Sequence, residues 1–373
     1  MLSITKKTPA SEDAGYSNRD PNLRMSTEPD EFVYVDRSGS PIHMIVDIYT
    51  HIMPPAFLKS MESLGQSSGL VKRMAAIHEL HDLDARFRAM DAFGDYRQII
   101  SLPNPPLEVV TTLEQGRDLA RLANDSMAEM VARHPKRLPG FVAALPFHDV
   151  ESAVMEMKRA VETLGARGIQ IYTNVKGRPL DDAQFEPIFA AMEKYDLPIW
   201  LHPARPASMP DYSSEKLSRL EMWWCFGWPY ETSVAMSRLA LSGVFDRHPK
   251  LKIITHHMGG MIPYFDKRIE DGMALLGTRT QTEDYSGILP ALKRPLIEYF
   301  HMFYADTALF GASRGLACGL DFFGVSHVVF ASDAPLGPLA TTCEGVARME
   351  LEKVDLEAVH HGNAEKLLNM RIE

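Results

Sequence analysis

The chain has 373 residues, of which 45% are hydrophobic and 24% are charged. This composition is that of a globular protein with a large core and excludes a wholly disordered chain. The 39 basic and 49 acidic residues give a net charge of -10, and no basic cluster is longer than a pair such as Lys6-Lys7. The charge therefore argues against nucleic acid or an anionic membrane as a partner.

The cysteines and the N-terminus bear on location. Cys225, Cys318 and Cys343 are odd in number and far apart, which fits neither a disulfide framework nor a thiolate zinc site, so we expect a reducing, cytoplasmic location. The first 41 residues are rich in Ser, Pro, Asp and Lys and lack the apolar run of a signal peptide or membrane anchor. We expect residues 1–42 to form an extended arm, either disordered or wrapped on a neighbouring subunit, and residues 43–373 to form one domain.

From residue 44 onward, short apolar β-branched runs alternate with longer amphipathic stretches, a rhythm typical of repeated β-strand and α-helix units. The runs are Met44–Tyr49, Tyr96–Leu102, Leu138–Leu145, Gly168–Tyr172, Pro198–His202, Leu251–His256, Met302–Thr307 and His327–Asp333. Eight parallel strands close a barrel, so the predicted fold is an α/β (β/α)8 TIM-type barrel.

Two of the helical stretches are well marked. Residues 113–134 carry apolar side chains at helical spacing, and Asp181-Asp182 precede a predicted helix at 185–195 as capping residues. The segments after the first and fifth strands, 51–95 and 203–250, are longer than one helix requires, so we expect lids or interface elements there.

Polar side chains gather at the carboxyl ends of the predicted strands, where a barrel of this kind builds its binding site. They are Asp47, Tyr49 and His51 after strand one, His202 after strand five, His256 and His257 after strand six, and Asp333 after strand eight. Side chains alternate along a strand, which predicts one common face for the three strand-one residues. Histidine and carboxylate ligands from four strands predict a metal site.

These segments resemble a known family. The runs VDIYTHIMP, IISLPNPPLE, GIQIYTNVKGRPLDD, IWLHPAR, IITHHMGGMIPYF, FYADTALFG, FASDAPLG and GNAEKLLNM are similar to those of the amidohydrolase-related metal-dependent enzymes. The resemblance is to the branch of aminocarboxymuconate-semialdehyde decarboxylase and γ-resorcylate decarboxylase, and it spans residues 44–369. It implies a metal-dependent barrel enzyme.

The resemblance assigns roles to individual residues. It implies metal ligands at Tyr49, His51, His202 and Asp333. His257, which precedes Met258-Gly259-Gly260, best matches the strand-six histidine, which is catalytic in the decarboxylases and a second-metal ligand in dinuclear relatives. His256 is then an additional metal-type histidine. Strand alternation lets only one of the two point into the barrel unless the backbone is already turning.

The chain departs from the family pattern in strand one. The family usually has His-x-His or Glu-x-His, whereas this sequence has Tyr49-Thr50-His51. A phenolate ligand favours oxidised iron or manganese over zinc. Strand four offers no carboxylate to bridge two metals, so Glu231 and Asp306 are the candidates. We expect one or two divalent ions per chain: zinc, manganese or iron.

The leading hypothesis is a carboxy-lyase or hydrolase for a small carboxylate-bearing substrate, unsaturated or aromatic in the case of decarboxylation. His257 would exchange a proton, and Asp333 would bind the metal and orient bound water. Arg205, three residues after His202, would clamp a second substrate charge. Trp228 lies in the aromatic stretch of residues 223–228, which predicts a lid over an apolar substrate or a subunit interface.

Two other functions stay open. A dinuclear iron or iron-manganese oxygenase that hydroxylates a small carboxylic or amino acid is favoured by Tyr49 and by the doubled histidine. A catalytically silent supporting subunit that kept the fold is the third possibility. We expect a homodimer or an oligomer with a related subunit.

Overall fold

The computed structural model describes residues 44–64, 73–280 and 282–373. The predicted arm at residues 1–42 lies outside these residues, so the arm and its boundary stay predictions. None of the helices in the described ranges is long and apolar enough to cross a membrane.

Within the described residues, eight parallel strands form a closed barrel. They fall into two hydrogen-bonded sheets, β1-β2-β3 and β4-β7-β8-β9-β10. A bridge between Ala143 and Ile169 joins the sheets on one side. The Ile48 amide donates to the Phe330 carbonyl at 3.0 Å and closes the other side. The strands are β1 (Ile45–His51), β2 (Tyr96–Ser101), β3 (Gly140–Phe141), β4 (Ile169–Tyr172), β7 (Ile199–His202), β8 (Ile253–Thr255), β9 (Tyr304–Asp306) and β10 (Val328–Val329).

Each strand overlaps its predicted run, and the predicted fold class is confirmed. One hairpin, β5 (Asn174–Val175) with β6 (Arg178–Pro179), lies outside the barrel and was not predicted.

The strands are buried on both faces, as parallel strands are when helices cover a barrel. All seven residues of β1 are buried. One apolar cluster fills the barrel interior and includes Val46, Ile48, Trp200 and Ile254. A larger cluster lies between the strands and the surrounding helices.

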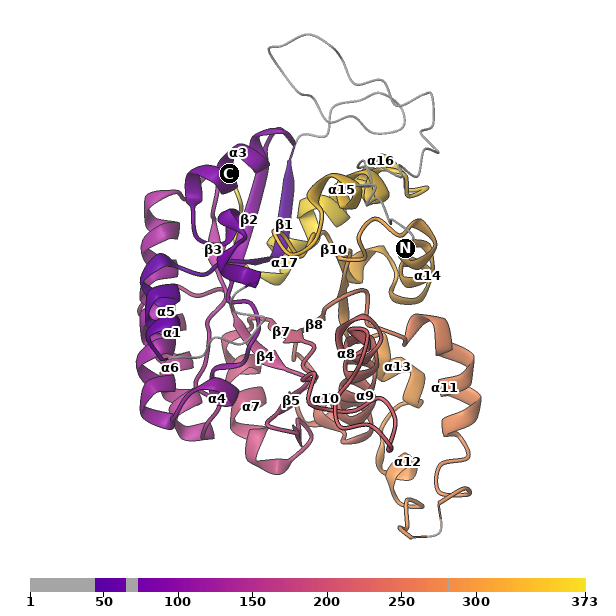
Figure 1. The fold of residues 1–373 in the computed structure, drawn as a ribbon. Helices are drawn as coiled ribbons and strands as arrows, with labels where there is room; N and C mark the ends of the chain where they lie inside the picture. The colour runs from indigo at the N-terminus through magenta and orange to yellow at the C-terminus, as the bar shows by residue number, and fades with distance from the viewer. Residues whose placement is uncertain (1–43, 65–72, 281) are drawn as a thin grey trace, which may run out of the picture.

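Helices surround the barrel, with α1, α5 and α6 on one side and α9, α11 and α13 on the other (Figure 1). The helices are α1 (Pro55–Ser63), α3 (Leu83–Asp91), α4 (Leu107–Val110), α5 (Leu113–Arg133), α6 (Val150–Glu162), α7 (Glu186–Tyr195), α8 (Met222–Cys225), α9 (Gly227–Leu241), α10 (Val244–Arg247), α11 (Asp266–Met273), α12 (Ile288–Ala291), α13 (Leu296–Phe300), α14 (Ser313–Phe323), α15 (Leu339–Ala347), α16 (Lys353–Glu357) and α17 (Asn363–Leu367).

Local sequence explains the two predicted helices. Thr112 and Gln115 form a reciprocal capping box at the start of α5, and Asp182 caps the short turn that leads into α7. Both helices are therefore confirmed.

Two histidines that lie away from the strand ends are also buried. His360 is buried in a π-helical turn. His248 is buried between Glu186 and Glu193, at 2.8 and 3.2 Å. The two partners of His248 lie on α7, and the sequence around His248 does not indicate them.

Candidate metal centre

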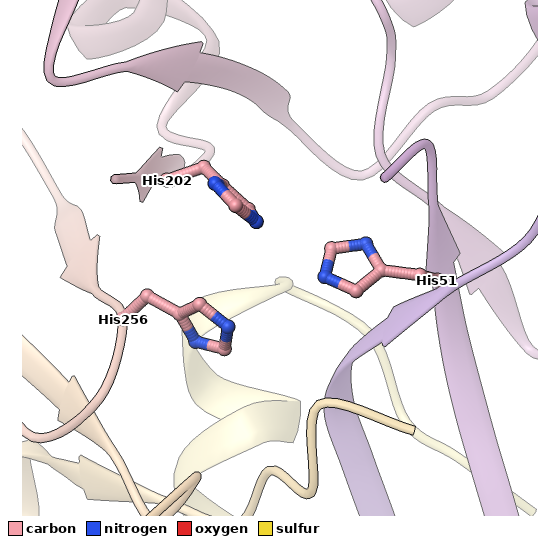
Figure 2. Close-up of side chains that lie close together, drawn as sticks. All are labelled: His51, His202 and His256. Atoms are coloured by element: carbon pink, nitrogen blue, oxygen red, sulfur yellow. The ribbon is translucent and has the colours of Figure 1, made fainter. Parts of the chain in front are cut away.

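Three histidine rings converge at the carboxyl ends of β1, β7 and β8. Figure 2 shows His51, His202 and His256 turned toward a common point, and their ligand atoms all lie within 4.8 Å of one another. All three residues are buried. Segments far apart in the sequence therefore supply one compact group of imidazoles.

Nδ1 of each ring contacts an oxygen atom, which fixes the orientation of the ring. Nδ1 of His51 lies 3.2 Å from the Leu102 carbonyl. Nδ1 of His202 lies 2.8 Å from the Pro203 carbonyl, and Nδ1 of His256 lies 2.5 Å from the Asp306 carboxylate. When Nδ1 donates to an oxygen, a neutral ring carries its lone pair on Nε2, which is the arrangement found in metal-binding histidines.

Asp333 adds a carboxylate to the cluster. Its Oδ1 lies 3.0 Å from Nε2 of His51 and 3.4 Å from Nε2 of His256. Burial alone would raise its pKa, but the two histidines outweigh burial and hold the pKa well below its usual value. Asp333 is therefore an anion facing the rings.

The doubled histidine enters the site as a pair. β8 ends at Thr255, and His257 has a left-handed backbone with φ of 57°. Because the chain is already turning, the two ring centroids lie 3.8 Å apart. His256 joins both groups of candidate ligands, the three histidines and the group of His256, His257 and Asp333. The geometry thus gives His256 at least as central a place as His257.

The electrostatics suit a cation. Burial, followed by the charges of His51 and His256, lowers the pKa of His202 well below its usual value, so its ring is neutral. Burial and His256 lower the pKa of His257 to about 4. Burial also acts to lower the pKa of His256, but the adjoining Asp306 and Asp333 outweigh it and raise the value to about 9.

A metal ion fits the residues present. Nε2 of His51 and Nε2 of His256 are buried and face the Asp333 carboxylate at 3.0 and 3.4 Å, and they have no well-aligned hydrogen-bond partner among the described residues. Ring nitrogens and a carboxylate oxygen that converge in a buried site form a donor set that a bound cation would satisfy. Nitrogen ligands with one carboxylate suit zinc, manganese or iron.

Tyr49 lies beside this cluster in the barrel interior. Its ring centroid is 4.0 Å from that of His256, and its buried hydroxyl has no hydrogen-bond partner in the part of the chain that the structure describes. Burial, then the charges of Asp306, Tyr172 and Asp333, raise its pKa well above the usual value. The phenol is therefore neutral unless a cation ionises it.

Asp47 does not share the face of Tyr49 and His51, contrary to the predicted alternation. The β1–β2 register shifts between Asp47 and Thr50. Asp47 instead bonds Tyr96 and Ser332, away from the histidines.

The two carboxylates proposed to bridge metals have other partners. Glu231 Oε1 accepts from Nη1 of Arg205 at 3.1 Å, and Glu231 belongs to neither group of candidate ligands among the described residues. Asp306 supports His256 from behind and accepts from the His257 amide at 2.9 Å. Glu231 as a metal ligand therefore stays a prediction, and Arg205 would compete with a metal for its carboxylate.

The two predicted substrate-binding residues differ in placement. The ring centroids of Trp228 and His202 are 5.8 Å apart, and the buried Nε1 of Trp228 has no hydrogen-bond partner within residues 44–64, 73–280 and 282–373. Arg205 is paired with Glu231 and lines an open cleft of about 880 Å³ with Tyr212, Leu220 and Phe226.

Sequence reasoning missed a group of polar residues next to His202. Asn104 Nδ2 lies 3.2 Å from Nδ1 of His202. Gln170 donates to the Tyr172 hydroxyl at 3.1 Å, and the Tyr172 and His202 ring centroids are 5.3 Å apart. Tyr172 ends β4, so the strand-end rule would have found it had it been applied to residues that are not common metal ligands.

A histidine and aspartate cluster at the carboxyl end of a (β/α)8 barrel defines a class of metal-dependent barrel enzymes. The amidohydrolase family model matches residues 46–370, and the chain belongs to this family. The prediction of its superfamily is confirmed.

Known relatives are carboxy-lyases. The chain is 33% identical over 299 residues to γ-resorcylate decarboxylase of Polaromonas sp. strain JS666, covering 77% of this chain and 87% of that protein. It is 27% identical to 2-amino-3-carboxymuconate-6-semialdehyde decarboxylase of Dictyostelium discoideum, covering 87% and 91% of the two chains.

A solved structure agrees with these relatives. The dihydroxybenzoic acid decarboxylase of Polaromonas sp. JS666, with bound manganese and the inhibitor 2-nitroresorcinol, superposes with a TM-score of 0.73 at 28% identity. The match covers 88% of this chain and 97% of that one. The expectation of a metal-dependent enzyme related to carboxy-lyases is confirmed.

Proposed function

We propose that the protein is a divalent-metal carboxy-lyase acting on a small hydroxylated aromatic carboxylate. The observation that carries the proposal is the convergence of the His51, His202 and His256 ring nitrogens beside the Asp333 carboxylate. The names of the relatives supply the reaction class, because fold alone does not determine chemistry.

His51, His202, His256 and Asp333 would hold the ion. When bound, the metal would supply a positive charge that orients the substrate carboxylate and a neighbouring oxygen. Manganese is the first choice, since the Polaromonas structure contains it. Tyr49 stands beside these groups as a further candidate ligand.

His257 is the proposed proton carrier. Its Nδ1 is buried and has no hydrogen-bond partner among the described residues, and its low pKa keeps the ring neutral at pH 7. Once protonated from solvent, such a ring is a strong acid. It would deliver a proton to the ring carbon that bears the carboxylate. The carbon-carbon bond then breaks, its electron pair returns to the aromatic ring, and CO₂ leaves.

Trp228 is the proposed substrate contact. Its unpaired Nε1 beside His202 can donate to a substrate oxygen, and its indole can pack on an aromatic ring. Arg205 is already neutralised by Glu231, so it would contact a substrate only at the cleft.

The test is turnover of 2,6-dihydroxybenzoate and related hydroxybenzoates by protein loaded with Mn²⁺. We expect CO₂ release and, in D₂O, one deuterium at the vacated ring carbon. Asp333→Asn should abolish turnover, and Val354→Ala on α16 is the distant control. A manganese-loaded protein that hydrolyses amides or lactones but releases no CO₂ would replace decarboxylation with hydrolytic cleavage.

A dinuclear iron or iron-manganese oxygenase is the second candidate, and the unpartnered Tyr49 hydroxyl beside His256 favours it. An iron-loaded protein would then consume O₂ with a small carboxylic or amino acid. Its visible charge-transfer band would be absent in Tyr49→Phe. A colourless protein that is active without O₂ would exclude this candidate.

We also propose that the enzyme works in the cytoplasm as an oligomer, with a copy of itself or a related subunit as partner. Tyr212, Leu220 and Phe226 are 73%, 83% and 66% exposed, and clustered exposed apolar side chains mark interfaces. Leu220→Asp should shift the mass measured by light scattering to that of a monomer. Val354→Asp, at a position 69% exposed on α16, is the matched control.

A further inference from the structure

A buried carboxylate lies behind the metal cluster without belonging to it. Asp47 is fully buried. Its Oδ1 accepts from the Ser332 amide at 3.0 Å, and its Oδ2 accepts from the Ser332 hydroxyl and from the Tyr96 hydroxyl, the latter at 2.5 Å. Asp47 thus joins β1 to the chain that leaves β10.

Ser332 immediately precedes Asp333. Its hydroxyl donates to Asp47 and accepts from the Ala334 amide at 3.0 Å, so it contacts the backbone on the far side of Asp333. The Asp333 amide itself donates to the Tyr49 carbonyl at 3.2 Å. Both ends of the Asp333 turn are therefore tied to β1.

Asp333 needs this support because its backbone is left-handed, with φ of 64°. A residue with a side chain adopts this conformation at a cost in free energy and keeps it only where its surroundings enforce it. The conformation places Asp333 Oδ1 at 3.0 Å from Nε2 of His51.

We propose that Asp47, acting through Ser332, is a positioning residue that aims the Asp333 carboxylate into the metal site. The inference rests on the proposed metal centre. It concerns the direction of the carboxylate and not the titration of any group.

Tyr96 provides the matched comparison. Its hydroxyl bonds the same Asp47 carboxylate, but its ring packs in the apolar layer between strands and helices. A general loss of packing around Asp47 would affect variants of Tyr96 and of Ser332 alike. Loss of the correct placement of the Asp333 carboxylate would weaken metal binding only in variants of Ser332.

The experiment measures the Mn²⁺ dissociation constant at fixed pH from the electron paramagnetic resonance signal of the free ion, together with the melting temperature without metal. We expect Ser332→Ala to weaken Mn²⁺ binding about 10- to 100-fold, the usual effect of removing support for a ligand. Tyr96→Phe should lower the melting temperature about as much as Ser332→Ala does, but it should leave the Mn²⁺ dissociation constant within about twofold of wild type.

Asp47→Asn completes a double-mutant cycle. If Asp47 acts through Ser332, adding Asp47→Asn to Ser332→Ala should weaken Mn²⁺ binding no further than the weaker-binding single variant. Should Asp47→Asn fail to fold, the comparison of Ser332→Ala with Tyr96→Phe decides alone.

Two outcomes overturn the inference. Equal dissociation constants for wild type and Ser332→Ala, or equal weakening in Ser332→Ala and Tyr96→Phe, would make the network purely structural. These results differ from failure of the proposed function, in which wild-type protein itself would bind no Mn²⁺ and the inference would fall with it.

Discussion

At the scale of single residues, Glu108 on α4 is a buried carboxyl group whose two oxygens have no hydrogen-bond partner in any other described residue. Burial raises its pKa from 4.5 to about 7, although a hydrogen bond from its own backbone and the charge of Lys176 act in the other direction. The folded state therefore binds this proton more tightly than the unfolded state. The contribution is complete below pH 4.5 and is lost as the pH rises to about 7.

Replacing this carboxyl group should consequently stabilise the protein at alkaline pH. We expect Glu108→Gln to raise the free energy of unfolding by up to about 3 kcal/mol at pH 8 and by much less at pH 4.5. Urea unfolding at the two pH values measures the difference. Glu129→Gln on the exposed face of α5 is the control, and a pH-independent effect of Glu108→Gln would contradict the argument.

His257 is a second test at this scale, because it adjoins the candidate ligands and is also the proposed proton carrier. We expect His257→Asn to lower kcat by about 10²- to 10⁴-fold, the usual value of acid-base catalysis, while one manganese per chain is retained. Elemental analysis separates the two roles. Loss of the metal in parallel with activity would make His257 a ligand, and His78→Asn at an exposed turn is the control.

At the scale of elements, the strand ends were predictable because two features of the sequence and fold constrain them. An apolar run fixes each strand, and barrel geometry then gathers the last polar residues, which brought His51, His202, His256 and Asp333 together from sequence alone. The place of Asp47 was not predictable, since a register irregularity in β1 leaves no mark in the sequence. The Arg205–Glu231 pair was missed because it forms between a loop and α9.

The start of α5 offers a prediction about an element. The Thr112 hydroxyl accepts from the Gln115 amide at 3.3 Å, and the Gln115 side chain accepts from the Thr112 amide at 3.0 Å. Thr112→Ala should therefore cost about 1 kcal/mol in the free energy of unfolding. Urea denaturation checks this value. Glu129→Ala, which removes an exposed ion pair with Arg133 on the same helix, should cost less than about 0.5 kcal/mol.

At the scale of the whole molecule, a bound metal would also link several strands of the barrel to one another. Its candidate ligands come from β1, β7, β8 and the chain after β10. β10 has two residues, so the closing side depends on few backbone bonds, among them His51 amide to Ala334 carbonyl at 2.8 Å. An ion that binds only the folded barrel would stabilise all of these elements together.

Removal of the metal should therefore lower the melting temperature of the entire domain in one transition. At a free Mn²⁺ concentration 100 times the dissociation constant, linkage predicts about 2.7 kcal/mol of stabilisation, which EDTA should remove and added Mn²⁺ restore. Differential scanning calorimetry with and without EDTA makes the measurement, and His202→Ala, which lacks a ligand, should be nearly insensitive to both. If wild type proved equally insensitive, the cluster of buried Nε2 atoms would need an explanation other than a bound cation.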